Sequence, residues 1–445
     1  MYRKQNLRNL QDIFDRSSND IAVLYGSRAT GLSEIVSDLI RDKECLYYRA
    51  SEVSEMTQRE LFANELHEQT KSPLLPNEDY EKLISSFINS ASGKKKLIVF
   101  DDFQHLIREN PTFINFLASF LFEKCESGTV MYLLVSDDVS WVEKDMIRLI
   151  GRKSSEISTV IKLNEYSPSE FSEAFPKMPL SEVIGIYSFI GGKSGYYNDI
   201  NDETTLRDLI IRELSKCSDI HFDPNMYLPK DIREPQMYNT IIMYLAKGVG
   251  KLNDVHNATG CDRAKLSVYI KSLIEADIVE KRGTAFYVIR DRMVRFYYRF
   301  LFPHLSSLAV IGVDRFYRRY IEHDIFSFME EAYPIFCMEQ IKWLRANNRL
   351  NFRVASIDEF YDKSGAIDFI ITAAGGSVIA CSCRYAGPHM SYKAYEDVRA
   401  SVRKNKLTCD NIWLFSASGF DQKLSMFGSV TPGVKLIDGA DQRLH

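Results

Sequence analysis

Ile21-Ala-Val-Leu-Tyr25, followed directly by Gly26-Ser-Arg-Ala-Thr-Gly-Leu-Ser33, is the stretch of sequence that decides the fold. An apolar run that ends at glycine predicts a buried strand, and the pattern from about Ser33 predicts a helix. Glycines let the loop curl so that successive backbone N–H groups and the helix N-terminus face a phosphate. The spacing G-x4-G-x-[ST] is therefore typical of a phosphate-binding loop.

The loop lacks the lysine that normally contacts the β- and γ-phosphates, because Leu32 occupies that position. Ser33 has the hydroxyl that suits Mg²⁺ coordination, and Arg28 is a candidate replacement for the missing charge. Two interpretations stay open: a site for ATP and Mg²⁺, or a tight strand-to-helix turn without a ligand. For the first, the expected nucleotide-binding residues are Gly26, Ser27, Arg28, Ala29, Thr30, Gly31, Leu32 and Ser33.

Two later apolar runs resemble the first. Leu97–Phe100 ends at Asp101-Asp102, and Met131–Val135 is the third run. Short apolar runs followed by polar turns fit buried strands of a parallel sheet with helices on both faces, so residues 1–165 are predicted to form a three-layer α/β domain. Asp101 is the candidate Mg²⁺ ligand and Asp102 the candidate group that orients the attacking water. A pair of acids at a strand end, without a ligand, is the alternative.

Composition sets the limits of this interpretation. The chain has 445 residues, 45% of them hydrophobic, with a net charge of -4, which excludes wholesale disorder and a uniformly basic nucleic-acid-binding coat. Its length suggests about three domains. Met1–Asp20 is polar throughout, and the apolar runs are shorter than a membrane span requires. The eight cysteines form no C-x2-C pair, so we expect no zinc site, no disulfides and a cytoplasmic location.

The middle of the chain predicts two helical modules. Residues 166–235 are expected to form a small helical lid, broken by Gly191-Gly192. Residues 236–300 predict three helices and a two-stranded hairpin, the outline of a winged helix-turn-helix. From Lys230 to Phe300 there are 13 Lys and Arg against 8 Asp and Glu, so the basic excess is local. The last part, 301–445, returns to an α/β pattern.

The basic residues of the third module are candidates for DNA contact. A recognition helix and a wing would present them to phosphates and to a groove. The alternative is an intramolecular docking surface, and acids in the same module dilute the charge. The candidate DNA-binding residues are Arg263, Lys265 and Lys271 on the helix, and Lys281 and Arg282 at the wing.

Several motifs, in order, resemble the archaeal-type ATPase family of the STAND/AAA-like class. Leu24–Arg28 with Gly31 is similar to its phosphate loop, and Val99–Gln104 to its acidic strand end. Gly151-Arg152 is similar to a pair that precedes its lid, and the stretch 266–300 resembles its winged helix and linker. The resemblance implies an ATP-binding core, a lid, a DNA-binding-like winged helix and a restriction-endonuclease-like C-terminal domain of unknown function. In this family context Arg152 would sense the γ-phosphate or act across a subunit contact.

Alignment with the family's nuclease-like motif places Asp368, Ser382 and Arg384 at its three positions. A serine cannot replace a carboxylate ligand of Mg²⁺, and an arginine is a poor substitute for a lysine that positions one water. Nuclease activity is therefore not expected. The resulting hypothesis is an ATPase-family protein with weak or lost hydrolysis that acts as a nucleotide-responsive regulator or a DNA-associated protein. The alternative is a non-enzymatic DNA- or protein-binding regulator, a pseudoenzyme.

Overall fold

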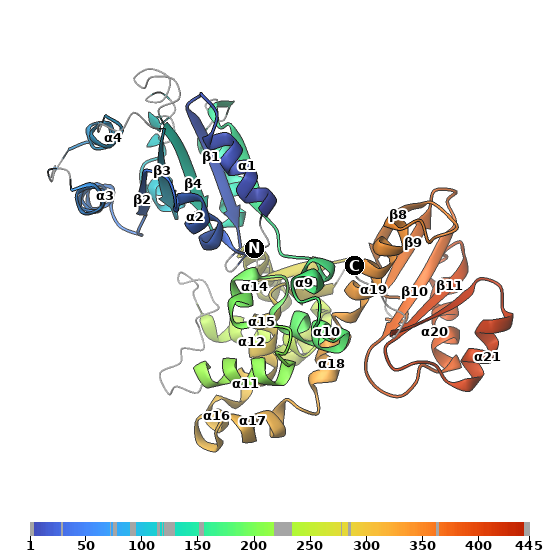
Figure 1. Cartoon of the computed structure of the whole chain (residues 1–445). Coiled ribbons are helices and arrows are strands. Elements are labelled where there is room, and N and C mark those ends of the chain that lie inside the picture. The colour runs from blue at the N-terminus through green and yellow to red at the C-terminus, as the bar shows by residue number, and fades with distance from the viewer. Residues whose placement is uncertain are drawn as a thin grey trace. The chain divides into compact units, whose positions relative to one another are not determined.

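The structure is a computed structural model of the chain (Figure 1). The residues that it describes are 4–27, 30–71, 73, 78–89, 95–113, 116–117, 119, 130–150, 155–217, 234–276, 278–283, 286–361 and 365–439. The chain separates into two compact units, the first formed by 1–165 with 193–198 and the second by 166–192 with 199–445. The finer division into four domains stays a prediction.

A parallel five-stranded sheet is the framework of the first unit, in the order β2-β3-β4-β1-β5. This confirms the predicted α/β architecture, and the three predicted apolar runs are β1, β3 and β4. Every residue of β1 and of β4 is buried, as expected for strands that are covered on both faces. The strands are β1 (Asp20–Gly26), β2 (Cys45–Arg49), β3 (Lys96–Asp101), β4 (Val130–Ser136) and β5 (Thr159–Leu163).

Helices pack on both faces of this sheet and create two separate cores. Ala22 and Leu24 of β1 pack with α1 (Lys4–Phe14) and α2 (Leu32–Ile40), whereas Ile21 and Val23 enter the opposite core. This alternation follows from the period of two along a strand. The second core is covered by α3 (Glu55–Thr70), α4 (Tyr80–Ile88), α5 (Gln104–Glu109), α7 (Val139–Trp141), the π-helix η1 (Val142–Met146) and α8 (Ile147–Ile150).

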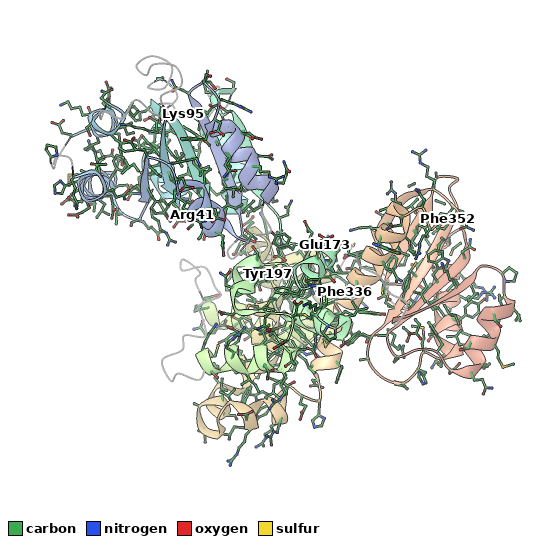
Figure 2. All side chains as sticks on the ribbon, viewed as in Figure 1. Arg41, Lys95, Glu173, Tyr197, Phe336 and Phe352 are labelled. Atoms are coloured by element: carbon green, nitrogen blue, oxygen red, sulfur yellow. The ribbon has the colours of Figure 1, made fainter. Side chains whose placement is uncertain are left out.

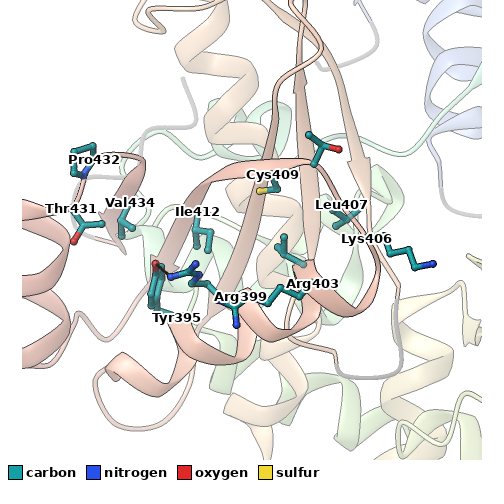
Figure 3. A pocket seen from close by; sticks show the side chains of 12 residues that line it. Tyr395, Arg399, Arg403, Lys406, Leu407, Cys409, Ile412, Thr431, Pro432 and Val434 are labelled. Atoms are coloured by element: carbon teal, nitrogen blue, oxygen red, sulfur yellow. Dashed lines mark hydrogen bonds between the residues drawn. The ribbon is translucent and has the colours of Figure 1, made fainter.

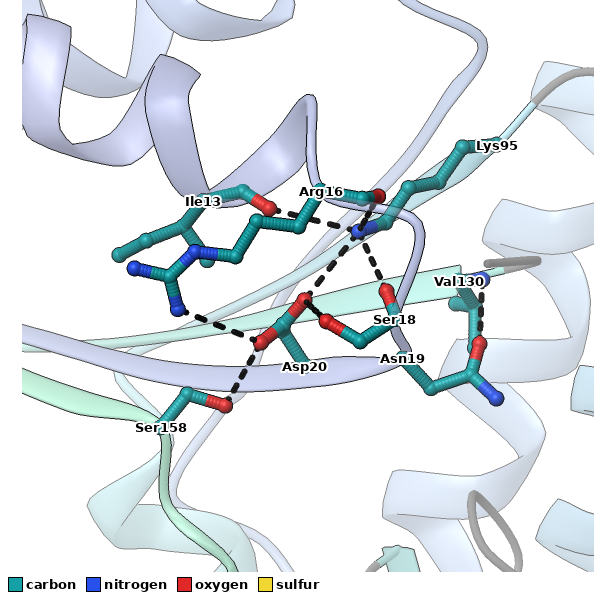
Figure 4. A network of polar contacts seen from close by, with 8 residues as sticks. All are labelled: Ile13, Arg16, Ser18, Asn19, Asp20, Lys95, Val130 and Ser158. Carbon is teal, nitrogen blue, oxygen red and sulfur yellow. Dashed lines mark hydrogen bonds and ion pairs between the residues drawn. The ribbon is translucent and has the colours of Figure 1, made fainter. Parts of the chain in front are cut away.

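A buried polar network ties α1 to the amino ends of the strands (Figure 4). The Lys95 ammonium donates to the Ser18 carbonyl at 2.6 Å and pairs with the Asp20 carboxylate at 3.2 Å. Asp20 also accepts a hydrogen bond from the Ser158 hydroxyl at 2.9 Å, which connects the start of β1 with the residue before β5. Burial lowers the pKa of Lys95, and Asp20 opposes this. The network holds three segments that are far apart in sequence.

Lys95→Met is expected to destabilise the first unit by about 3 kcal/mol. The substitution leaves the buried Asp20 carboxylate with only the longer ion pair to Arg16, at 3.9 Å, and leaves several carbonyl groups without their donor. Thermal unfolding measures the effect, with Lys82→Met as the control because Lys82 pairs with Glu78 at the surface. If both variants unfold at the wild-type temperature, the network does not stabilise the fold.

The second unit begins with helices that pack through aromatic side chains. Phe336, which is labelled in Figure 2, lies edge-on to Tyr187 with ring centroids 5.5 Å apart, and this contact joins α19 to α10. A β-carbon at Gly192 would lie 2.0 Å from the Tyr166 carbonyl oxygen, so only glycine fits after α10. The helices of this part are α9 (Pro168–Ala174), α10 (Leu180–Ile190), α11 (Leu206–Cys217), α15 (Arg292–Phe296), α16 (Leu305–Ile311), α17 (Val313–Tyr320), α18 (Ile325–Glu330) and α19 (Tyr333–Ala346), with the short helices η3 (Ser194–Asp199, mostly in the first unit), η4 (Tyr297–Leu301) and η5 (Phe302–His304).

The basic segment contains three helices and a hairpin. The helices are α12 (Pro235–Ala246), α13 (Leu252–Thr259) and α14 (Arg263–Glu275), and the antiparallel strands are β6 (Val279–Arg282) and β7 (Phe286–Ile289). Asp262 caps α14 through the backbone N–H groups of Ala264 and Lys265, as its position predicts. Assignment of these elements to a DNA-binding winged helix stays a prediction.

The C-terminal part of the second unit contains a mixed five-stranded sheet in the order β12-β11-β10-β9-β8. β10, β11 and β12 are parallel, and β9 is antiparallel to both of its neighbours. Our predicted strands at 366–371, 377–383 and 411–415 correspond to β9, β10 and β11 with shifted ends. The elements are β8 (Val354–Glu359), β9 (Phe369–Ala373), β10 (Val378–Arg384), α20 (Tyr392–Lys404), β11 (Cys409–Ser416), α21 (Gln422–Val430) and β12 (Val434–Asp438).

Candidate functional site

The glycine loop follows β1, and hydrogen bonds from Thr30 to the Ser27 carbonyl hold its conformation. The Thr30 hydroxyl donates to the Ser27 carbonyl at 2.6 Å, and Thr30 is almost fully buried. A β-carbon at Gly26 would lie 2.7 Å from the Leu163 carbonyl oxygen, so no larger residue fits there. Gly31 has φ +93°, a conformation that favours glycine, and α2 starts directly after it. The loop therefore directs the N-terminus of α2 toward the carboxyl edge of the sheet.

Leu32 does not point into a ligand site as a phosphate-binding lysine would. It is partly buried and packs against the core formed by α1, α2 and one face of the sheet. Ser33 is exposed at the first turn of α2, next to the exposed Glu34. The position of the missing lysine thus contributes to packing, and the charge near the helix N-terminus is negative. Arg28 and Ala29 lie outside the described residues, as does Arg152.

The acidic pair at the end of β3 is held by side chains of β2. The Tyr47 hydroxyl donates to Asp101 at 2.6 Å, and Arg49 Nε pairs with Asp102 at 2.7 Å. Burial raises the pKa of Asp101, and the Tyr47 hydrogen bond opposes this. Asp102 has φ +51° and also accepts a hydrogen bond from Gln104, at 3.4 Å. Both carboxylates are therefore engaged by this chain's own donors.

The sheet order places the loop and the acidic pair at one edge. β4 pairs in parallel with both β1 and β3, with Tyr25 opposite Ser136 and Phe100 opposite Leu134. Two strand spacings of about 4.8 Å therefore separate β1 from β3, roughly 10 Å. Val99 packs on the face that α2 covers, and the alternation along β3 puts Asp101 on that same face. The geometry brings together the two motifs that the sequence predicted separately.

Three residues at this edge were not predicted from the sequence. Ser136 ends β4 between the two motifs, and its hydroxyl accepts the Asp138 backbone N–H at 3.1 Å. A polar residue directly after the apolar run 131–135 was the available signal. Tyr47 and Arg49 had no such signal, because β2 itself was not predicted.

Two parts of the chain match known protein families. Residues 1–200 match a family described as an ATPase domain predominantly from Archaea, and residues 297–398 match a family of archaeal and bacterial proteins of unknown function. The first 200 residues are therefore similar to an archaeal-type ATPase domain. This confirms the family resemblance stated from the sequence motifs.

The individual proteins that this chain resembles are distant in sequence. An uncharacterized protein of Methanocaldococcus jannaschii is 23% identical over 386 residues, which are 83% of each chain. Among solved structures, the Walker-type ATPase of Pyrococcus abyssi is similar at 12% identity and a TM-score of 0.48, over 66% of this chain and 95% of that one. The ORC2 protein of Aeropyrum pernix is similar at 13% identity and a TM-score of 0.44, over 71% and 94%.

Within the described part of the chain, no group of three or more His, Cys, Asp or Glu side chains is arranged to hold a metal ion. The same residues contain no helix with the length and hydropathy needed to cross a membrane.

The candidate DNA-contact residues differ in their surroundings. Arg263 donates to Asn253 at 2.6 Å, and Lys271 pairs with Glu275 at 3.7 Å. Lys265 and Lys281 are exposed and pair with no described residue. Arg282 has a different position, because it contacts the C-terminal sheet.

The hairpin of β6 and β7 contacts the end of β8. Arg282 donates to the Tyr361 hydroxyl at 2.9 Å and lies 3.8 Å from the Glu359 carboxylate. A β-carbon at Gly283 would lie 3.0 Å from the Tyr361 β-carbon, and the Phe286 and Tyr361 rings are 6.1 Å apart. The side chain of Arg282 is therefore engaged inside the second unit, and its contact with DNA stays a prediction.

Asp368, the residue directly before β9, is held by backbone and side-chain groups of the second unit. The carboxylate accepts the Cys383 backbone N–H at 2.7 Å. The pKa of Asp368 is raised to about 7, mainly by desolvation and also by the nearby Glu330, while the Cys383 hydrogen bond and Arg384 oppose the shift. Glu330 itself accepts the backbone N–H groups of Tyr385 and Ala386. The sequence did not predict Glu330, because it precedes Asp368 by 38 residues on another element.

Asp368→Asn is expected to remove a pH dependence of stability. The folded chain keeps a proton on Asp368 that the unfolded chain releases above about pH 4, so the free energy of unfolding falls as pH rises toward 7. The variant is expected to be more stable than wild type at pH 8 by about 2 kcal/mol or more, and to match it near pH 4. Thermal unfolding at both pH values measures this, with the exposed Asp397→Asn as the control. A constant difference between the two pH values would contradict the assignment.

Proposed function

We propose that this ATPase-family protein binds ATP with Mg²⁺ at the carboxyl edge of its parallel sheet and hydrolyses it slowly or not at all. It would act as a nucleotide-responsive regulatory or DNA-associated protein. Gly26–Ser33 would hold the phosphates, Asp101 with Ser33 the metal ion, and Arg152 would sense the γ-phosphate. Bound Mg²⁺ would neutralise phosphate charge.

One observation carries this proposal: the glycine loop and the acidic strand end share an edge, while Leu32 packs into the core. The close packing that requires glycine at position 26 and the left-handed conformation of Gly31 suit a phosphate-binding loop. The group that would stabilise developing charge on the transferred phosphoryl is missing. Binding and hydrolysis depend on different residues, so the first can persist without the second.

The acidic pair supports slow hydrolysis. A residue that orients water needs a carboxylate oxygen that is free to accept its proton or hydrogen bond. Asp102 instead pairs with Arg49, and burial raises the pKa of Asp101, which disfavours its charged form. Arg49 would have to release Asp102 before that carboxylate could act on water.

Leu32→Lys is expected to strengthen ATP binding at least tenfold. A charge-assisted contact to phosphate contributes about 1.5–3 kcal/mol, offset in part by the packing that Leu32 loses. Isothermal titration with ATP and Mg²⁺ measures both proteins, and the same samples report the rate of phosphate release.

The matched control is Ile40→Lys, which adds the same charge at the other end of α2, where Ile40 packs on the same core. It is expected to leave ATP affinity unchanged. Absence of binding heat and of a thermal shift in both wild type and Leu32→Lys would refute the nucleotide proposal. Rapid wild-type phosphate release would refute the loss of hydrolysis.

A second candidate function is a non-enzymatic regulator that uses the hairpin module for docking. The contact of Arg282, Gly283 and Phe286 with Tyr361 favours it, because it joins this module to the C-terminal sheet. The half-buried Asp368, whose raised pKa favours the protonated form, supports a C-terminal domain retained as a scaffold rather than a nuclease. In this candidate, nucleotide binding would alter the strength of the hairpin contact.

Tyr361→Ala is expected to accelerate amide hydrogen exchange in β6 and β7 at least tenfold, because the hairpin loses a ring contact and a hydrogen bond. Mass spectrometry of the exchanged peptides, with and without ATP, measures this. Tyr320→Ala removes an aromatic side chain from α17 and is the control. Unchanged exchange in Tyr361→Ala would eliminate docking through this residue.

A further inference from the structure

Two basic cavities lie at one edge of the C-terminal sheet, here meaning the end at which β8, β10 and β11 begin. The first has a volume of about 430 Å³, and its cationic lining is Arg399, Arg403 and Lys406 (Figure 3). The second has a volume of about 560 Å³ and is lined by Arg345 and Arg353. No acidic side chain is among the described residues that line either cavity. Both cavities therefore favour anionic ligands.

Strand register places the two cavities at the same edge. Val354 of β8 lies opposite Ala373, the last residue of β9, and Val378, the first residue of β10, pairs with Cys409 at the start of β11. The first cavity adjoins Cys409, and the second adjoins Val354. Three strand spacings, roughly 14 Å, separate β8 from β11. This edge, called the basic edge below, lies at the opposite end of β10 from Arg384.

The two helices that end at the basic edge explain why its cations gather there. α19 ends at Ala346 and α20 at Lys404, and cations near a helix C-terminus are stabilised by the helix dipole. The sequence contains no Asp or Glu from 343 to 353 or from 398 to 409. Arg345, Arg353, Arg403 and Lys406 are exposed and form no ion pair with any described carboxylate. Their charges are therefore free for an external ligand.

We propose that the basic edge of the C-terminal sheet binds the phosphate backbone of duplex DNA without sequence preference. The two cavities lie on opposite faces of the sheet, because Ile412 lines the first while Phe352, which lines the second, packs on Trp413. Their cations therefore surround one end of the sheet, where they can contact the phosphates of a single duplex. Between them lies the β9–β10 turn, Ala374-Gly375-Gly376, whose small side chains cannot read bases. The Ala374 N–H donates to the Arg353 carbonyl at 2.7 Å, which places this turn beside the second cavity.

The aromatic residues of this region favour duplex over single-stranded nucleic acid. Single strands are bound through exposed aromatic rings on which bases stack. Tyr395 and Trp413 are buried, with 6% and 7% exposure. Arg399 donates to the Tyr395 hydroxyl at 3.4 Å, and Phe352 packs against Trp413 at 6.0 Å (Figures 2 and 3). These rings support the cations and offer no stacking platform.

The proposal does not depend on ATP binding, so the test uses the full chain without nucleotide. Fluorescence anisotropy with a 24-bp duplex of mixed sequence gives the affinity between 50 and 200 mM salt. Arg345→Gln/Arg353→Gln and Arg403→Gln/Lys406→Gln are each expected to bind about tenfold more weakly at low salt. Each is expected to reduce the slope of log affinity against log salt by about two, because two phosphate contacts are lost.

Lys71→Gln/Lys82→Gln removes the same charge from exposed sites of the first unit and is expected to bind like wild type. Wild-type affinity in both basic-edge variants would overturn the proposal, as would absence of DNA binding by the wild type. Loss of binding only in Lys265→Gln/Lys281→Gln would assign DNA contact to the helix-hairpin module instead. Tighter binding of a 24-nucleotide single strand, or equal displacement by polyglutamate, would also refute a duplex site.

Discussion

Parallel pairing of β4 with both β1 and β3 is the constraint on which the first unit depends. Because all three strands run in one direction, their carboxyl ends meet at one edge, and motifs 75 residues apart in sequence become neighbours. The same pairing buries β1 and β4 on both faces, which requires helices on each side. The helix that follows the glycine loop is therefore both a cover for the sheet and one wall of the candidate site.

Both potential chemical centres have carboxylates that are already engaged. Arg49 pairs with Asp102, Tyr47 donates to Asp101, and the half-buried Asp368 accepts a hydrogen bond from the Cys383 backbone N–H. Hydrogen bonds of this kind satisfy buried polar groups without any ligand. The charged groups at both positions are thus satisfied by partners within the chain.

The strands predicted from the sequence were those buried on both faces, whose continuous apolar runs are distinctive. β2 and β5 at the sheet edges, and β8 and β12 in the second sheet, were missed because their residues are half-buried and mixed in polarity. This omission also affected the candidate site. Tyr47 and Arg49 belong to β2, so the sequence did not identify them as partners of Asp101 and Asp102. Asp262 was predicted as a helix cap because capping is a local interaction.

The sequence by itself determined the strand-loop-helix unit, the acidic strand end, the absence of the phosphate-binding lysine and the local excess of basic residues. These features depend on neighbouring residues and on spacing. Only the tertiary structure decided that Leu32 packs in the core, that Arg282 contacts Tyr361, and that basic residues near 345–353 and 399–406 share one edge. Each of these depends on contacts between distant segments, which strand order and packing create and no local pattern encodes.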